Sequence, residues 1–212
     1  MGLLARSLLL SGQMPLARQA AEQSMAAVRR ERWNAFLPWP QVLYAQCLVE
    51  GGRGDEGGEE AERAFALACE LGDPCWEGMA ARALGLAALH AGDLKSAQAW
   101  LADARRRCDR VPDRYVWISA YIGLAQLEAA VPGDAALIAA GAARLYHYAA
   151  RHDLPEFLAW ALVYQAEAGD RDKAALARRA AADVANPRLQ ARVQGLSSRV
   201  EPGTGRSRNQ RC

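Results

Sequence analysis

A glycine-rich run at residues 51–58, GGRGDEGG, is the segment whose residue types could most readily bind a phosphate. Phosphate loops aim backbone N–H groups at the anion from a helix start, usually together with a lysine. Here Glu56, Glu59 and Glu60 crowd the expected helix start and would repel a phosphate. No G-x-x-x-x-G-K-[ST] pattern occurs in the chain. We therefore expect residues 51–58 to form a flexible loop between two helices.

Histidine and cysteine spacing suits neither a metal centre nor a nucleophilic one. His147 and His152 are five residues apart, which places them on different faces of a helix. The 5 cysteines are odd in number and contain no C-x-x-C pair, so reduced thiols of a cytoplasmic protein are expected. No cysteine or serine is paired with a histidine by local spacing. The sequence predicts no catalytic residue, no metal site and no cofactor, which indicates a protein that is not an enzyme.

Arginines supply nearly all the positive charge, and they gather in two places. Arg105, Arg106 and Arg107 should lie at a helix C-terminus, where the helix dipole favours cations. The second group, at the end of the chain, comprises Arg199, Arg206, Arg208 and Arg211. These could contact nucleic-acid phosphates, but such binding would be weak and lost with salt, and no aromatic residues are interleaved for base stacking. Nucleic acid is therefore not the expected partner, although a regulator that acts through this tail is the alternative function.

Composition argues for an all-helical fold. The chain contains 46 Ala and 26 Leu but only 10 Val, 3 Ile and 1 Thr. Alanine and leucine favour helices, whereas strands favour β-branched side chains. The fold class expected is therefore all-α.

Residues 78–109 match the template of a tetratricopeptide repeat, a helix pair of about 34 residues. Large and small residues recur at the template's spacing, as Leu84, Gly85, Gly92, Asp93, Ala97, Leu101 and Ala104. We expect Gly85 and Ala97 to face each other where the two helices cross, because only small side chains fit there.

Three other stretches fit the template in part, and one near residues 113–151 fits poorly. The matching residues are Leu4, Ala5, Gly12, Ala17, Ala21 and Ser24 in the first unit; Ala45, Ala61, Phe65 and Ala68 in the second; and Leu162, Gly169, Asp170, Ala174 and Ala181 in the last. The second unit fits only if the loop at 51–58 carries about four extra residues. We expect an α-solenoid of about five tetratricopeptide-like hairpins over residues 1–200 and a disordered basic tail at 201–212.

The helices predicted from periodicity and punctuation cover 2–11, 14–32, 38–50, 59–71, 76–91, 94–109, 114–130, 134–151, 154–168, 171–185 and 187–199. Asp93, Asp134 and Asp170 should cap helices. Glu59, Glu60 and Glu62 should lie in a first helical turn.

The concave groove of such an array is its expected binding surface. The residues that this register places in or beside the groove are Trp39, Gln46, Met79, Arg82, Leu86, His90, Trp117 and Tyr121. They include no Lys/Arg and Asn set of the kind that clamps a peptide carboxylate. Their mixed aromatic and aliphatic character favours an apolar helix or extended protein segment as the ligand.

Residues 75–121, CWEGMAARALGLAALHAGDLKSAQAWLADARRRCDRVPDRYVWISAY, together with RRAAADVANPRL near the end, resemble the C-terminal helical-repeat region of actinobacterial LuxR-type regulators and related signalling ATPases. The resemblance implies a sensor or protein-interaction arm. The ATPase and DNA-binding functions of that family are not carried over, because the phosphate-binding motif is missing and no space remains for a helix-turn-helix after residue 200.

The N-terminal segment MGLLARSLLLSG is too short in its apolar run to act as a signal peptide, and no stretch approaches a membrane span of ~20 apolar residues. Leu8, Leu9 and Leu10 are too apolar for a solvent-facing cap of the array. They suggest that a missing domain, a partner or a second copy of the chain covers this end, which makes self-association through the N-terminal hairpin a possible interaction.

Overall fold

The computed structural model describes residues 1–111, 115–130 and 134–198, with side chains up to Leu196. All regular structure in these ranges is helical, which confirms the all-α prediction. The helices are α1 (Gly2–Leu10), α2 (Met14–Arg30), the short 3-10 helix η1 (Asn34–Phe36), α3 (Pro38–Glu50), α4 (Gly54–Leu71), α5 (Pro74–His90), α6 (Leu94–Cys108), α7 (Val116–Glu128), α8 (Ala135–Arg151), α9 (Pro155–Glu167), α10 (Lys173–Ala181) and α11 (Pro187–Ser198). The predicted disordered tail and the tail arginines lie outside the described residues.

Odd-numbered and even-numbered helices are buried to different extents. Helix α5 buries an unbroken run from Cys75 to Leu86, whereas α6 buries only Ala97, Leu101, Ala104 and Cys108. The same contrast holds between α3 and α4, and between α9 and α10. Each odd-numbered helix also contacts the next odd-numbered helix. Helices α3, α5, α7 and α9 therefore form an inner layer, and α4, α6, α8 and α10 cover it with one apolar stripe each.

The turn that joins an inner helix to its outer partner repeats along the chain. Gly12, Gly52 and Gly92, spaced 40 residues apart, adopt φ values of 74°, 81° and 79°. In each turn the residue after the glycine donates its N–H to a carbonyl five residues earlier, as in Gln13 to Leu8, Arg53 to Leu48 and Asp93 to Ala88. This is the Schellman pattern of helix C-termini, which requires the left-handed backbone that glycine adopts most easily.

Small residues lie where the paired helices cross. A Cβ atom on Gly85 would lie 2.8 Å from Leu101 Cγ and 3.3 Å from the Ala97 carbonyl oxygen, which confirms the predicted contact. A Cβ atom on Gly57 would lie 2.9 Å from the Ala45 oxygen. In both pairs the facing residues are 12 positions apart, and the buried Ala5 and Ala17 have the same separation.

The predicted loop at residues 51–58 is wrong. The turn occupies only residues 51–53, and α4 begins at Gly54, so its first turn contains Asp55 and Glu56 rather than Glu59, Glu60 and Glu62. The second unit therefore has no extra loop residues, and Gly57, not Ala61, lies opposite Ala45. The tight turn suffices because Gly52 supplies the left-handed backbone.

Two of the three predicted aspartate caps are confirmed. Asp93 accepts a hydrogen bond from the Ser96 N–H at 3.0 Å, and Asp134 accepts one from the Leu137 N–H at 2.9 Å. Asp170 does not cap α10, because that helix begins only at Lys173.

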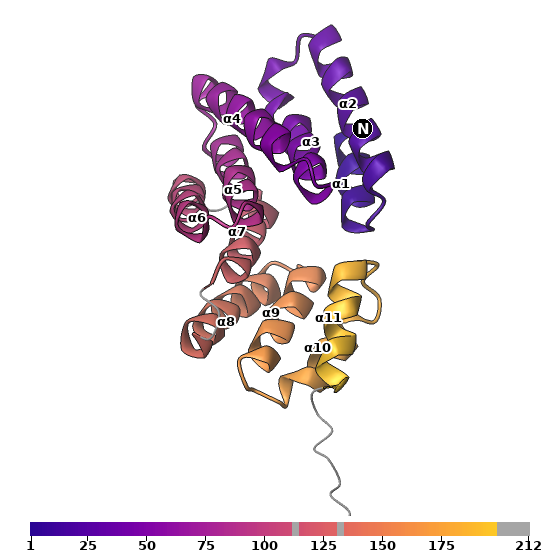
Figure 1. Ribbon diagram of the computed structural model, residues 1–212, viewed down its shortest axis with the longest axis vertical. Helices are drawn as coiled ribbons and strands as arrows, with labels where there is room; N and C mark the ends of the chain where they lie inside the picture. The colour runs from indigo at the N-terminus through magenta and orange to yellow at the C-terminus, as the bar shows by residue number, and fades with distance from the viewer. Residues whose placement is uncertain (112–114, 131–133, 199–212) are drawn as a thin grey trace, which may run out of the picture.

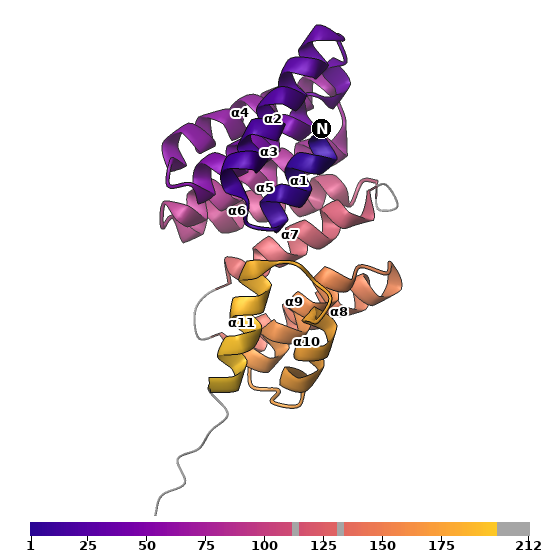
Figure 2. The same ribbon diagram turned by 90° about the vertical axis from the view of Figure 1, so that its right-hand side faces the viewer.

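The two ends of the helix array meet. Figures 1 and 2 both show the α1–α2 turn beside the start of α11. The contact joins Gly12 to Pro187, whose Cγ lies 3.3 Å from the position of a Cβ on Gly12. Leu10 packs against the C-terminal hydrophobic cluster of α7–α11, and Leu9 is 7% exposed. The chain itself therefore covers much of the Leu8–Leu10 run, while self-association through the N-terminal hairpin stays a prediction.

Other apolar side chains near the N-terminus do face solvent, since Leu3 and Leu4 are 74% and 50% exposed.

Among the described helices, none combines the length and the apolar character that a membrane span needs.

Candidate binding cavity

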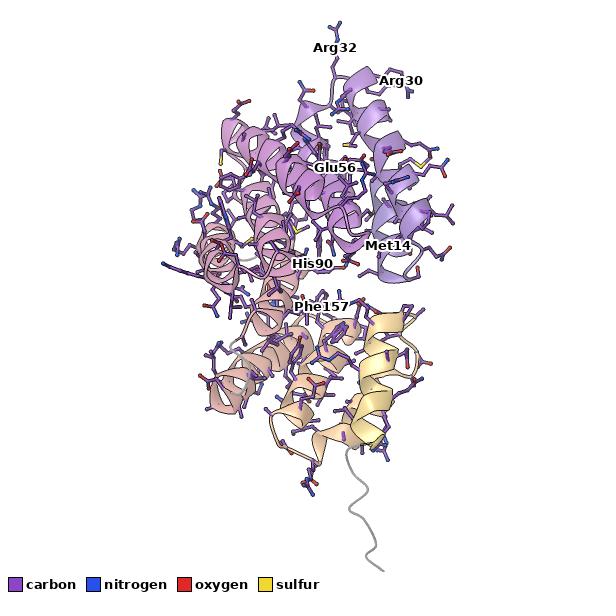
Figure 3. All side chains as sticks on the ribbon, viewed as in Figure 1. Met14, Arg30, Arg32, Glu56, His90 and Phe157 are labelled. Atoms are coloured by element: carbon purple, nitrogen blue, oxygen red, sulfur yellow. The ribbon has the colours of Figure 1, made fainter. Side chains whose placement is uncertain are left out.

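A cavity of about 460 Å³, called the central cavity below, lies where the inner helices face the two ends of the array. Figure 3 shows Met14 and His90 at the edge of the α1–α7 half that faces α9–α11. Residues from α1, α2, α3, α5, α7, α9, α11 and two adjoining turns line it: Leu9, Leu10, Gly12, Met14, Gln46, Val49, Glu50, Arg82, Leu86, Leu89, His90, Tyr121, Leu124, Glu128, Glu156, Trp160, Tyr164, Asn186, Pro187, Arg188 and Arg192. The contact between α1–α2 and α11 thus turns the expected groove into a partly enclosed space.

Arg82 is the most deeply buried charge in this cavity, with 4% of its surface exposed. Its Nε donates to the Tyr121 carbonyl oxygen at 3.3 Å, and its Nη1 donates to Gln46 Oε1 at 3.3 Å. The guanidinium carbon lies 4.8 Å from the centre of the Tyr121 ring, a cation–π distance. No carboxylate among the described residues forms an ion pair with Arg82. Burial lowers the pKa of this guanidinium, because it disfavours the charged form.

Two further arginines stack on aromatic rings beside the cavity. Arg6 donates from Nε to the Tyr121 hydroxyl at 3.2 Å, and its guanidinium lies 4.9 Å from the Trp117 ring centre. Arg192 donates to the Tyr164 hydroxyl at 2.9 Å and lies 4.4 Å from that ring centre. Burial raises the pKa of Tyr164 to about 12, so its hydroxyl stays protonated at neutral pH. These contacts fix the walls of the cavity in place.

The carboxylates that line the cavity differ in how they are neutralised. Glu128 forms an ion pair with Arg188 at 3.0 Å, while Arg192 pairs with Glu167 at 3.1 Å from its Nε. Glu50 accepts a hydrogen bond from the neutral Gln46 amide at 2.7 Å, and Glu156 accepts one from Asn186 at 2.7 Å. Within the described part of the chain, neither Glu50 nor Glu156 forms an ion pair.

Five of the eight predicted groove residues line the central cavity: Gln46, Arg82, Leu86, His90 and Tyr121. Trp39 and Trp117 instead form an aromatic cluster with Trp76 beside it. The Trp39 ring centre lies 4.9 Å from that of Trp117 and 5.8 Å from that of Trp76. Met79 does not reach the cavity, because it is buried in the hydrophobic core at 3% exposure.

The cavity also uses residues that the sequence did not single out. Arg188 and Arg192 form ion pairs with Glu128 and Glu167 at the cavity wall. Their spacing of four residues on a helix was a usable signal, because it places both on one face. No signal along the chain shows that α11 folds back toward α1.

A second and larger cavity of about 720 Å³ lies among α6, α7 and α8. Three of its polar side chains donate to backbone carbonyls, Gln98 to Ala129, Arg105 to Ser119 and Gln126 to Leu101, whereas the buried Tyr148 hydroxyl has no hydrogen-bond partner among the described residues. It contains none of the predicted groove residues. The central cavity is therefore the better candidate for ligand recognition.

Over the described ranges, no group of three or more His, Cys, Asp and Glu side chains is placed to hold a metal ion.

No protein-family model matches this chain, and the comparison with curated proteins finds no significant match.

Proposed function

We propose that this chain is a non-enzymatic recognition module, built as a tetratricopeptide-like solenoid of about five hairpins. The repeated Schellman turns at Gly12, Gly52 and Gly92 support the repeat interpretation. The small-residue crossings 12 positions apart support it too, because this separation matches that of Gly85 and Ala97 in the unit that fits the template.

The observation that carries the proposal is the convergence of inner-helix side chains on the central cavity. Gln46, Arg82, Tyr121 and Tyr164 come from four successive inner helices and all face one space. Concave surfaces of repeat arrays are the usual place for partner binding. A regulatory arm of a bacterial signalling or transcription-control system, located in the cytoplasm, is the role that best suits such a module.

The partner proposed is a protein or peptide segment that enters the concave side. The contact of the α1–α2 turn with α11 narrows this side, so an end or a short extended stretch of the partner fits better than a long helix.

Site-specific photo-crosslinking tests this function. A photo-reactive phenylalanine analogue is placed at His90, on the cavity rim, and at the exposed Arg106 on the outer helix α6 as a matched control. In the source cells, the rim position should give a discrete crosslinked adduct that the control lacks. Equal adducts at both positions, or none at either, would contradict the proposal. A gel-shift titration addresses the alternative: DNA binding at modest salt would favour the regulator that acts through its tail, and no binding there would exclude it.

A further inference from the structure

Arg82 carries a buried charge that no described carboxylate contacts directly, although Glu128 and Glu50 act on it at longer range. Guanidinium groups remain protonated in proteins. Burying such a charge without a counter-charge is costly. The Nη2 nitrogen of Arg82 makes no hydrogen bond with the described residues. It is also not one of the fully buried side-chain atoms that lack a hydrogen-bond partner, so it remains accessible from the cavity. An anionic group bound in the cavity would reach this nitrogen and supply the direct ionic contact that Arg82 lacks.

The same cavity contains carboxylates without a direct cationic partner. Glu50 and Glu156 are hydrogen-bonded only by the neutral amides of Gln46 and Asn186. A ligand with a single negative charge would be repelled by these two carboxylates, and one with a single positive charge would be repelled by Arg82. A ligand with one charge of each sign can place its anionic group at Arg82 and its cationic group at one of the two carboxylates, while the Arg188–Glu128 and Arg192–Glu167 pairs contribute little net charge.

The rest of the wall is largely apolar. Leu86 and Leu124 come from the inner helices, Leu9 and Leu10 from α1, and Trp160 from α9. A volume of about 460 Å³ lies within the range of small-molecule sites and far below what a folded domain needs. The cavity therefore suits a compact ligand with an apolar body.

We propose that the central cavity binds a small zwitterion with an apolar body, of the class of short peptides with free ends. Its carboxylate contacts Arg82, and its ammonium group points toward Glu50 and Glu156. The proposal rests on the recognition function above and names the chemistry that the same site selects.

Isothermal titration calorimetry on the full chain tests the proposal, with trialanine and trileucine as probes. Two blocked forms of trileucine separate the charges: the C-terminal amide lacks the carboxylate, and the N-acetyl form lacks the ammonium group. We expect saturable binding of trileucine, at least tenfold weaker binding of the amide, and weaker binding of the acetylated form. Trialanine should bind more weakly than trileucine, because it buries less apolar surface.

Two variants assign the contacts. Arg82→Met keeps an unbranched side chain but removes the guanidinium, and it should abolish the preference for a free carboxylate. Arg29→Met on the exposed face of α2 should bind as the native chain does. Glu50→Gln should bring the acetylated and free peptides closer in affinity. If Arg82→Met does not fold, Glu50→Gln and the blocked peptides still decide the question.

The proposal is overturned if the folded chain binds neither tripeptide, if amidation leaves the affinity unchanged, or if folded Arg82→Met binds as tightly as the native chain. Any of these results would leave the photo-crosslinking test of the recognition function untouched.

Discussion

Two adjacent glycines in α4 offer a direct test of how closely α3 and α4 cross. A Cβ atom on Gly57 would lie 2.5 Å from Val49 Cγ2, 2.9 Å from the Ala45 oxygen and 3.0 Å from the Val49 nitrogen. A Cβ atom on Gly58 would meet only the Ala87 Cβ, at 4.0 Å. Both glycines lie inside the helix, so replacement by alanine gives them a similar gain in helix propensity.

For Gly58→Ala we expect the free energy of unfolding to rise by up to about 1 kcal/mol, the difference in helix propensity between the two residues. For Gly57→Ala the same gain is opposed by overpacking, which costs about 1–3 kcal/mol and more where backbone atoms must move. Two of the three close contacts of Gly57 are backbone atoms that cannot rotate away. Gly57→Ala should therefore be less stable than Gly58→Ala by about 1–3 kcal/mol.

Urea denaturation followed by circular dichroism at 222 nm measures both variants against the native chain. Because repeat arrays can unfold in more than one step, the transition midpoints and slopes are compared before free energies are derived. Equal stabilisation by both substitutions would refute the close crossing. If neither substitution stabilised the chain and both were neutral, residues 54–58 would be a loop and not the first turns of α4.

Other expected outcomes concern buried polar groups. Glu77→Gln should lower the free energy of unfolding, measured by urea denaturation, by about 1–3 kcal/mol, because this buried carboxylate accepts hydrogen bonds from two arginines. The control Glu62→Gln, at an exposed position, should have little effect. Burial raises the pKa of the Cys47 and Cys108 thiols to about 12, so the unfolded chain loses these protons first as the pH rises. The free energy of unfolding should therefore fall above pH 9, by about 1.4 kcal/mol per thiol at pH 10. The contribution of these two thiols to the pH dependence should vanish when both cysteines are replaced by alanine. In a variant whose C-terminal cysteine is replaced by serine, a thiol reagent should modify the exposed Cys69 of the native protein well before Cys47 and Cys108. Equal rates of modification at the three thiols would contradict the burial of Cys47 and Cys108.

The sequence predicted those parts of the fold that depend on neighbours along the chain. Turn glycines and small residues at helix crossings are local signals, so the unit around Gly85 and Ala97 could be placed correctly. The error at residues 51–58 arose because a run of glycines suggests a loop. The conformation of Gly52 and the tight packing of Gly57 make the same residues a short turn and the start of a helix.

The binding cavity was only partly predictable. Helical register placed Gln46, Arg82 and Tyr121 on the concave side, where the structure has them. The environment of Arg82 depends on residues more than 30 positions away in the sequence, and the approach of α11 to α1 brings together Gly12 and Pro187 from the two ends of the array. Periodicity and local spacing carry no information about such contacts.

The central claim is that the two ends of the array meet and enclose the central cavity. The Cβ position of a side chain at Gly12 lies 4.0 Å from the Pro187 Cβ, within the range found in disulfides. The measurement is mass spectrometry of the unreduced double variant Gly12→Cys, Pro187→Cys, with exposed Cys69 and the C-terminal cysteine replaced by serine.

Most of the monomer should form an intramolecular disulfide between positions 12 and 187. A control pair, Gly12→Cys with Gly92→Cys, should form little, because no atom lies within 4 Å of a Cβ at Gly92. If the 12–187 pair crosslinks no more than this control, the ends of the array do not meet, and the central cavity is an open groove.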